Sequence, residues 1–185
     1  MPRAVCPRCA RPASTCLCAT LPRPLAVRTE LLVLQHPAEA GHAKNSAAFL
    51  TLGLNPAARL LRGEVFDPAL AAPGTALLYP GEGETVLAPA SVNRLILLDG
   101  SWRQSRRLLA ANPWLAALPR LSLPPQASRY AIRRAHRPGQ LSTLEAGLHA
   151  LALLEGDAGR FQPLWAAFDE FVRVGLSRRG ETGLT

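Results

Sequence analysis

The sequence predicts an α/β fold, a mostly parallel sheet with helices on both faces, preceded by a small cysteine-rich module. Short apolar runs that suit buried strands alternate with segments that carry helix-start signals, an order typical of parallel sheets. All four cysteines lie within the first 18 of 185 residues, which sets this segment apart. A chain of this length is expected to form one main core. We therefore divide it into a module over residues 1–24 and an α/β domain over residues 25–185.

The four cysteines form two short pairs, Cys6 with Cys9 and Cys16 with Cys18, separated by six residues. Thiolates at this spacing can converge on one tetrahedral ion, and zinc is the usual ion of four-cysteine sites. A redox motif, an iron–sulfur cluster and two disulfides are the alternatives. The redox motif lacks a βαβ context, and two isolated disulfides in so short a segment would be strained. We predict a structural Zn²⁺ site in a reducing, cytoplasmic location.

The first half of the α/β domain is expected to contain two strands and a helix. Residues 21–26 indicate an extended connector, because each proline disfavours a helix. The apolar run at 29–35 suits a buried strand, and a helix is expected over about 44–54. A second strand is expected at 76–78, running into a tight turn at 79–81.

The clearest buried strand covers residues 93–98 and leads directly into a helix signal. Ser101, followed three residues later by Gln104, forms a capping-box pattern and predicts a helix over 102–111. Asp99 lies at the end of this strand, where ligands bind in open α/β sheets. From the residues alone, Asp99 either satisfies the amides of the turn or serves a functional site.

A second capping box marks the C-terminal part of the domain. Ser142 and Glu145 predict a long apolar helix through residue 154 that ends at Gly156. A last amphipathic helix is expected over 163–177. No signal peptide and no membrane-spanning run is recognisable.

The charge distribution favours a nucleic-acid partner. The formal net charge is +8, and the stretch 100–144 contains no acidic residue. This stretch contains a group of arginines: Arg103, Arg106, Arg107, Arg120, Arg129, Arg133, Arg134 and Arg137. Such a tract is typical of proteins that bind a polyanion, because arginine pairs with phosphate. The alternative is a solvated arginine-rich surface.

Five motifs, in order, carry a resemblance to a known family. They are the cysteine pairs, His36-Pro37-Ala38-Glu39, Leu78-Tyr79-Pro80-Gly81, the run LLDGSW ending at Trp102, and Ser142-Thr143-Leu144-Glu145-Ala146. With these motifs the chain resembles the DTW-domain family of tRNA-uridine aminocarboxypropyltransferases. Two departures are visible: Ser101 stands where the family has threonine, and Asn45-Ser46-Ala47 replaces Asn-Thr-Gly.

The resemblance implies a SPOUT-like fold with a C-terminal trefoil knot and S-adenosyl-L-methionine as donor. It implies transfer of the 3-amino-3-carboxypropyl group to N3 of a tRNA uridine, releasing methylthioadenosine. A SPOUT-like RNA methyltransferase and a non-catalytic zinc-containing RNA-binding protein are the alternatives. Neither a membrane nor an obligate protein partner is implied.

The resemblance also suggests roles for individual residues. Asp99 is the expected general base, with Ser101 and Trp102 beside it at the catalytic site. The donor pocket is expected to contain Tyr79, Pro80, Gly81, Leu98, Ser142, Thr143 and Glu145. The expected nucleic-acid contacts are Arg103, Arg106, Arg107, Arg129, Tyr130, Arg133 and Arg134. For Glu145 a purely structural part in the capping box is an equal alternative, and His36 is expected to be a structural histidine.

Overall fold

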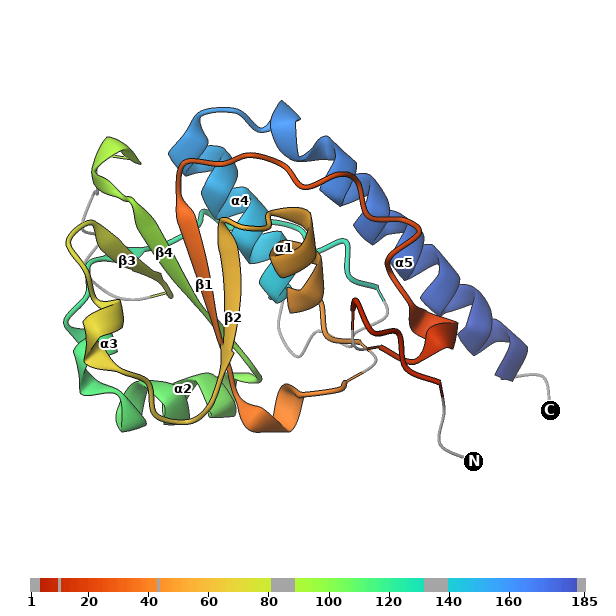
Figure 1. Cartoon of the computed structure of the whole chain (residues 1–185), viewed down its shortest axis with the longest axis horizontal. Helices are drawn as coiled ribbons and strands as arrows, with labels where there is room; N and C mark the ends of the chain where they lie inside the picture. Colours follow the sequence, from red (N-terminus) through yellow and green to blue (C-terminus); the bar gives the residue numbers. More distant parts are fainter. Residues whose placement is uncertain (1–3, 10, 43, 81–88, 132–139, 183–185) are drawn as a thin grey trace.

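The computed structural model describes residues 4–9, 11–42, 44–80, 89–131 and 140–182 (Figure 1). Within them the chain forms a five-stranded sheet in the order β2-β1-β4-β3-β5, and every neighbouring pair is parallel. The strands are β1 (Glu30–Gln35), β2 (Ala58–Arg62), β3 (Thr75–Leu78), β4 (Arg94–Asp99) and β5 (Arg120–Leu121). The predicted parallel α/β fold is confirmed.

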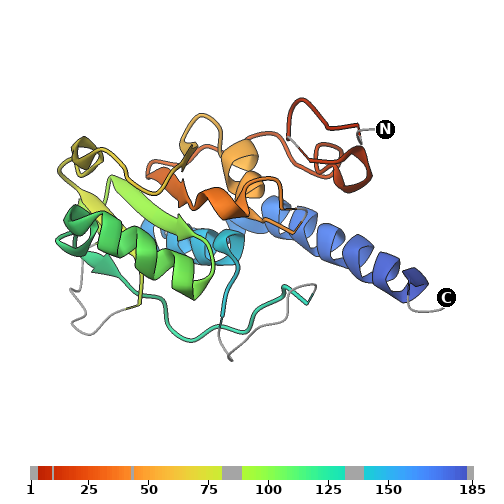
Figure 2. The same ribbon diagram turned by 90° about the horizontal axis from the view of Figure 1, so that it is seen from below.

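Helices cover both faces of this sheet, as predicted (Figures 1 and 2). One face packs against α1 (Ala47–Gly53), α4 (Thr143–Glu155) and α5 (Gln162–Thr182). The other packs against α2 (Trp102–Ala111) and the short α3 (Pro113–Ala116). The central strands β1 and β4 are apolar on both sides because side chains alternate between two buried faces. Both faces are therefore closed, and the sheet edge at the strand ends is the place for a site.

Both predicted capping boxes are present. At α2 the Ser101 side chain accepts from the Gln104 amide while the Gln104 side chain accepts from the Ser101 amide. Ser142 and Glu145 make the same reciprocal pair at α4, which ends at Gly156 in the left-handed conformation. Helix α1 begins at Ala47, later than predicted, because the Asn45 side chain accepts a hydrogen bond from the Ala47 amide.

Among the described strands and α-helices, β2, β5 and α3 were not predicted. Strand β2 has the sequence Ala-Arg-Leu-Leu-Arg and lies at the edge of the sheet. Its two arginines interrupt the apolar run that would indicate a buried strand. Strand β5 has only two residues and α3 only four. Elements this short carry no periodicity that a sequence pattern can reveal.

The cysteine-rich module lies beside α5 (Figure 1), where the Arg11 guanidinium packs over the Phe171 ring in the middle of the helix. Its Leu17 is buried in the same core as the α/β domain. The division into residues 1–24 and 25–185 stays a prediction. The knot implied by the resemblance also stays a prediction, since residues 132–139 lie outside the described residues. Among the described helices, none is both long and apolar enough to cross a membrane.

Candidate functional site

Asp99 lies at the carboxyl end of β4, is 4% exposed, and is held by three neutral donors. Its Oδ1 accepts a hydrogen bond from the Thr143 hydroxyl. Its Oδ2 accepts from the side-chain amides of Gln35, at 2.8 Å, and Asn45, at 2.6 Å. No described cation forms an ion pair with it. The carboxylate is thus fixed in direction without being neutralised.

Gln35 and Asn45 were not predicted as site residues. Gln35 ends β1, directly beside Asp99 in the sheet register. Its Oε1 accepts from Arg62 Nε at 3.2 Å, which orients the amide so that its nitrogen faces Asp99. A polar residue at the end of an otherwise apolar strand is the sequence signal that could have indicated Gln35.

A cavity of about 190 Å³ opens beside Asp99. Its wall comes from the segment between β1 and α1, from the end of β4 and from the start of α4: Glu39, His42, Lys44, Asn45, Ser46, Asp99 and Thr143. It therefore presents both a carboxylate and the single lysine of the chain. The predicted residues Asp99 and Thr143 meet here.

Ser142 and Glu145, two other predicted donor-pocket residues, are buried and already engaged. The Glu145 carboxylate accepts from the Ser142 amide at 2.7 Å and the Arg129 amide at 2.6 Å, and also from the Ser128 hydroxyl. Ser142 Oγ accepts from the Glu145 amide. This geometry favours the structural alternative for Glu145, since its oxygens hold residues 128–129 against α4.

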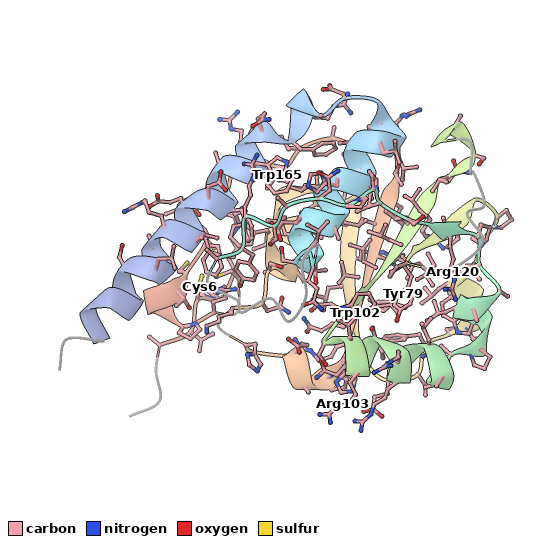
Figure 3. All side chains as sticks on the ribbon, turned by 180° about the vertical axis from the view of Figure 1, so that it is seen from behind. Cys6, Tyr79, Trp102, Arg103, Arg120 and Trp165 are labelled. Carbon is pink, nitrogen blue, oxygen red and sulfur yellow. The ribbon has the colours of Figure 1, made fainter. Side chains whose placement is uncertain are left out.

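An aromatic group lies on the other side of the β4 terminus. Trp102 is 46% exposed, and its ring meets Tyr79 edge-on with centroids 5.7 Å apart. The Arg120 guanidinium lies 5.6 Å from the centre of the Tyr79 ring. Figure 3 shows these three side chains near one another. Tyr79 directly follows β3, Trp102 begins α2 and Arg120 begins β5. Flat rings with a neighbouring arginine suit a nucleobase.

The remaining predicted residues of this edge have simpler surroundings. Ser101 serves as the cap of α2, Pro80 is exposed, and Leu98 packs with the core on the α2 face. Gly81 lies outside the described residues. His36 is buried; its Nδ1 accepts from the Ala38 amide and its Nε2 lies 3.5 Å from Glu64, as a structural histidine would.

The predicted nucleic-acid residues divide into exposed and engaged groups. Arg103, Arg106 and Arg107 project from α2, and none of them forms an ion pair with a described residue. Arg129 pairs with Asp169 at 3.1 Å and lies 4.8 Å from the centre of the Trp165 ring.

Tyr130 is a correction. It is 5% exposed and packs against Phe168 and Phe171, while its hydroxyl donates to the Lys44 carbonyl. The ring is therefore not available for stacking on a base. Arg133 and Arg134 lie outside the described residues.

The four cysteine sulfurs lie within 4.8 Å of one another. The Sγ atoms of Cys6 and Cys18 are 3.7 Å apart, as are those of Cys9 and Cys16. Tetrahedral zinc with Zn–S bonds of about 2.3 Å needs a separation of about 3.8 Å, so the cluster fits the ion. Backbone amides of Cys9 and Arg8 lower the pKa of the Cys6 thiol to about 6, and burial raises the pKa of Cys18 to about 12.

Comparison with known proteins agrees with these motifs. Residues 3–176 match the family described as DTW domain. The chain is 36% identical over 166 residues to tRNA-uridine aminocarboxypropyltransferase 2 of Drosophila melanogaster, covering 81% of this chain and 66% of that protein. It is 34% identical over 170 residues to the Mus musculus protein of the same name, covering 83% and 57%.

A plant relative is more distant. Identity to tRNA-uridine aminocarboxypropyltransferase A of Arabidopsis thaliana is 32% over 136 residues, covering 60% of this chain and 52% of that protein. The chain thus matches two thirds or less of the length of these relatives. A search of solved structures gave no significant match. The family match and the identities together show that the chain belongs to the DTW domain family.

Proposed function

We propose that this chain transfers the 3-amino-3-carboxypropyl group of S-adenosyl-L-methionine to N3 of a uridine in tRNA. The observation that carries the proposal is the Asp99 carboxylate, buried at the end of β4 beside a polar cavity, which receives hydrogen bonds from neutral donors only among the described residues. The names of the relatives support the same reaction class and the same RNA substrate.

In this proposal Asp99 acts as general base. It accepts the N3 proton of the uridine, and the nitrogen electron pair attacks the γ-carbon of the donor. The bond between that carbon and the sulfonium breaks, its electrons stay on sulfur, and neutral methylthioadenosine leaves. Gln35, Asn45 and Thr143 keep the carboxylate oriented throughout, which reduces the reorganisation that proton transfer requires.

The polar cavity is suited to the amino-acid end of the donor. Lys44 can pair with the donor carboxylate and Glu39 with its ammonium, because both side chains line the same space as Asp99. This assignment replaces Ser142 and Glu145, whose polar groups are already occupied. Binding of the donor's amino-acid end would turn its γ-carbon, and not its methyl group, toward the uridine. It would therefore favour aminocarboxypropyl transfer over methyl transfer.

The RNA would approach along α2 and the aromatic group. Trp102, supported by Tyr79 and Arg120, offers a stacking surface close to where the target base must sit. Arg103, Arg106 and Arg107 extend from the same helix toward solvent and supply charge for phosphates. In this arrangement tRNA meets one continuous edge of the domain. Zn²⁺ on the four thiolates would hold the N-terminal module in shape, a structural role.

The deciding experiment incubates the full chain with tRNA and S-adenosylmethionine labelled either in the carboxyl group or in the methyl group. Label from the carboxyl group alone should enter the RNA. Label from the methyl group alone would identify a methyltransferase, and label from neither would favour a non-catalytic RNA-binding protein.

An Asp99→Asn variant tests the base. It keeps the shape of the side chain, so tRNA binding should remain while turnover falls by about 10²- to 10⁴-fold. Glu64→Gln, a change at an exposed residue outside the cavity, is the matched control and should keep full turnover. Normal turnover of Asp99→Asn would refute the general-base assignment.

A further inference from the structure

Arg11 is a buried arginine of the N-terminal module with no part in the mechanism above. It lies between the two cysteine pairs and is 5% exposed. A guanidinium keeps its charge in proteins, so burying it requires acceptors for its N–H groups. The residues that supply them show what the side chain connects.

Arg11 makes contacts in three directions. Its Nε donates to the Thr15 carbonyl at 2.9 Å, inside the cysteine module. One terminal nitrogen donates to the Asn45 carbonyl at 2.7 Å, in the loop before α1. Its guanidinium carbon lies 4.9 Å from the centre of the Phe171 ring on α5. The side chain therefore joins the module to two parts of the α/β domain.

The Asn45 contact leads directly to the site. Arg11 fixes the Asn45 carbonyl, while the Asn45 side chain donates to Asp99 Oδ2 at 2.6 Å and accepts from the Ala47 amide at 2.9 Å. The preceding carbonyl, of Lys44, accepts from Tyr130. The backbone carbonyls of Lys44 and Asn45 are thus held by side chains from distant parts of the chain. This fixes the backbone from which the Asn45 side-chain amide points to Asp99.

We propose that Arg11 is a positioning residue, which couples the metal-held shape of the cysteine module to the orientation of Asn45 and, through it, of the Asp99 carboxylate. Cys6, Cys9, Cys16 and Cys18 would hold the segments on either side of Arg11 when they share one ion. Release of that ion would loosen those segments and remove the anchor of Asn45. The module then affects turnover, although none of its cysteines lies at the cavity.

The first test observes Asn45 itself, by NMR of the ¹⁵N-labelled, metal-loaded full chain. In Arg11→Met the side-chain amide signal of Asn45 should shift relative to wild type. In Arg11→Lys, which keeps a group that can donate to the Asn45 carbonyl, the signal should lie closer to its wild-type position. Arg8→Met is the matched control, since Arg8 lies in the same module but is exposed. Removing zinc from the wild-type protein with a chelator should shift the same signal.

The second test is kinetic and rests on the proposed transferase function. Arg11→Met should lower kcat by about tenfold to a hundredfold, the range expected when a catalytic group is slightly misplaced. The KM for tRNA and the zinc content should stay unchanged. In an Asn45→Ala background the same change should have little further effect, because both residues act through one contact.

The outcomes separate the two proposals. An Asn45 signal that stays in place in Arg11→Met refutes the coupling, as does an effect on kcat that simply adds to that of Asn45→Ala. A shifted signal in a protein that transfers no group supports the coupling and refutes the proposed function. Should Arg11→Met fail to fold, the chelation experiment on the wild-type protein decides, and an Asn45 signal that stays in place after zinc removal refutes the coupling.

Discussion

The Thr143 hydroxyl donates a hydrogen bond to Asp99 Oδ1 across 44 residues of sequence and joins the start of α4 to the end of β4. This bond predicts the effect of Thr143→Val, which preserves shape and removes the donor. A hydrogen bond to a charged group contributes about 1.5–3 kcal/mol, so kcat should fall by about ten- to hundredfold. Turnover assays on tRNA would measure this.

Thr143→Ser is the matched control for that change. Serine keeps the hydroxyl and the start of the helix, so turnover should stay within about threefold of wild type, equivalent to less than 1 kcal/mol. Equal losses in the valine and serine variants would mean that the methyl group matters and that the bond to Asp99 does not.

The exposed arginines of α2 predict a salt-dependent loss of RNA affinity. Arg106→Ala should weaken tRNA binding and reduce the slope of log K against log salt by about 0.7–0.9, the value for one phosphate contact. Replacing Arg103, Arg106 and Arg107 together by alanine should reduce this slope by about three times as much as Arg106→Ala does. Fluorescence anisotropy at several salt concentrations would show this.

Arg173→Ala controls for net charge. Arg173 is exposed, like the α2 arginines, but lies on α5, where it pairs with Glu170. Its removal should leave the slope unchanged. If it lowers the slope as much as Arg106→Ala, RNA binding depends on total charge and the α2 surface has no special part.

The cysteine cluster predicts one zinc ion per chain. Because the chain has only these four cysteines, a thiol reagent should react slowly with the metal-loaded protein and with four thiols after chelation. Cys9→Ser should lower zinc content measured by mass spectrometry. Zinc binding requires thiolates, so affinity should fall as the pH falls. Rapid reaction of all four thiols in freshly purified, zinc-containing protein would place the metal elsewhere.

The buried carboxylate of Glu155 predicts a pH-dependent contribution to stability. Desolvation raises its pKa, but hydrogen bonds from Thr29 and Arg28 outweigh this and lower the pKa overall. A depressed pKa stabilises the fold above the unfolded value of about 4.3, and the contribution is lost as the pH falls through the folded value. Glu155→Gln should cost about 1–3 kcal/mol at pH 7.

Urea unfolding at pH 7, 4 and 3 would check this, since the difference between the unfolding free energies of wild type and Glu155→Gln should narrow below about pH 4.3. Glu170→Gln is the control, because an exposed ion pair within one helix contributes little to stability in water. A difference that widens toward acid would contradict the assigned direction of the pKa shift.

Local signals predicted the fold well, and contacts between distant segments decided what was missed. The capping boxes gave α2 and α4 their starting residues, because a cap is built from neighbours in sequence. Gln35 was missed as a partner of Asp99 because their meeting depends on β1 lying beside β4, and Asn45 was missed because its loop returns to the end of β4. No pattern within a single strand specifies that order. Tyr130 was misassigned because an arginine-rich neighbourhood in sequence does not reveal which side chain turns into the core.

The neutrality of the three side chains that donate hydrogen bonds to Asp99 has a consequence for the end of the proposed reaction. No described cation pairs with the Asp99 carboxylate, so before the reaction it is available to attract the sulfonium of the incoming donor. Once the bond between the γ-carbon of the donor and its sulfur breaks, the sulfur carries no charge and this attraction is lost. The spent thioether should therefore dissociate readily and inhibit weakly, so that successive cycles are not slowed by by-product accumulation.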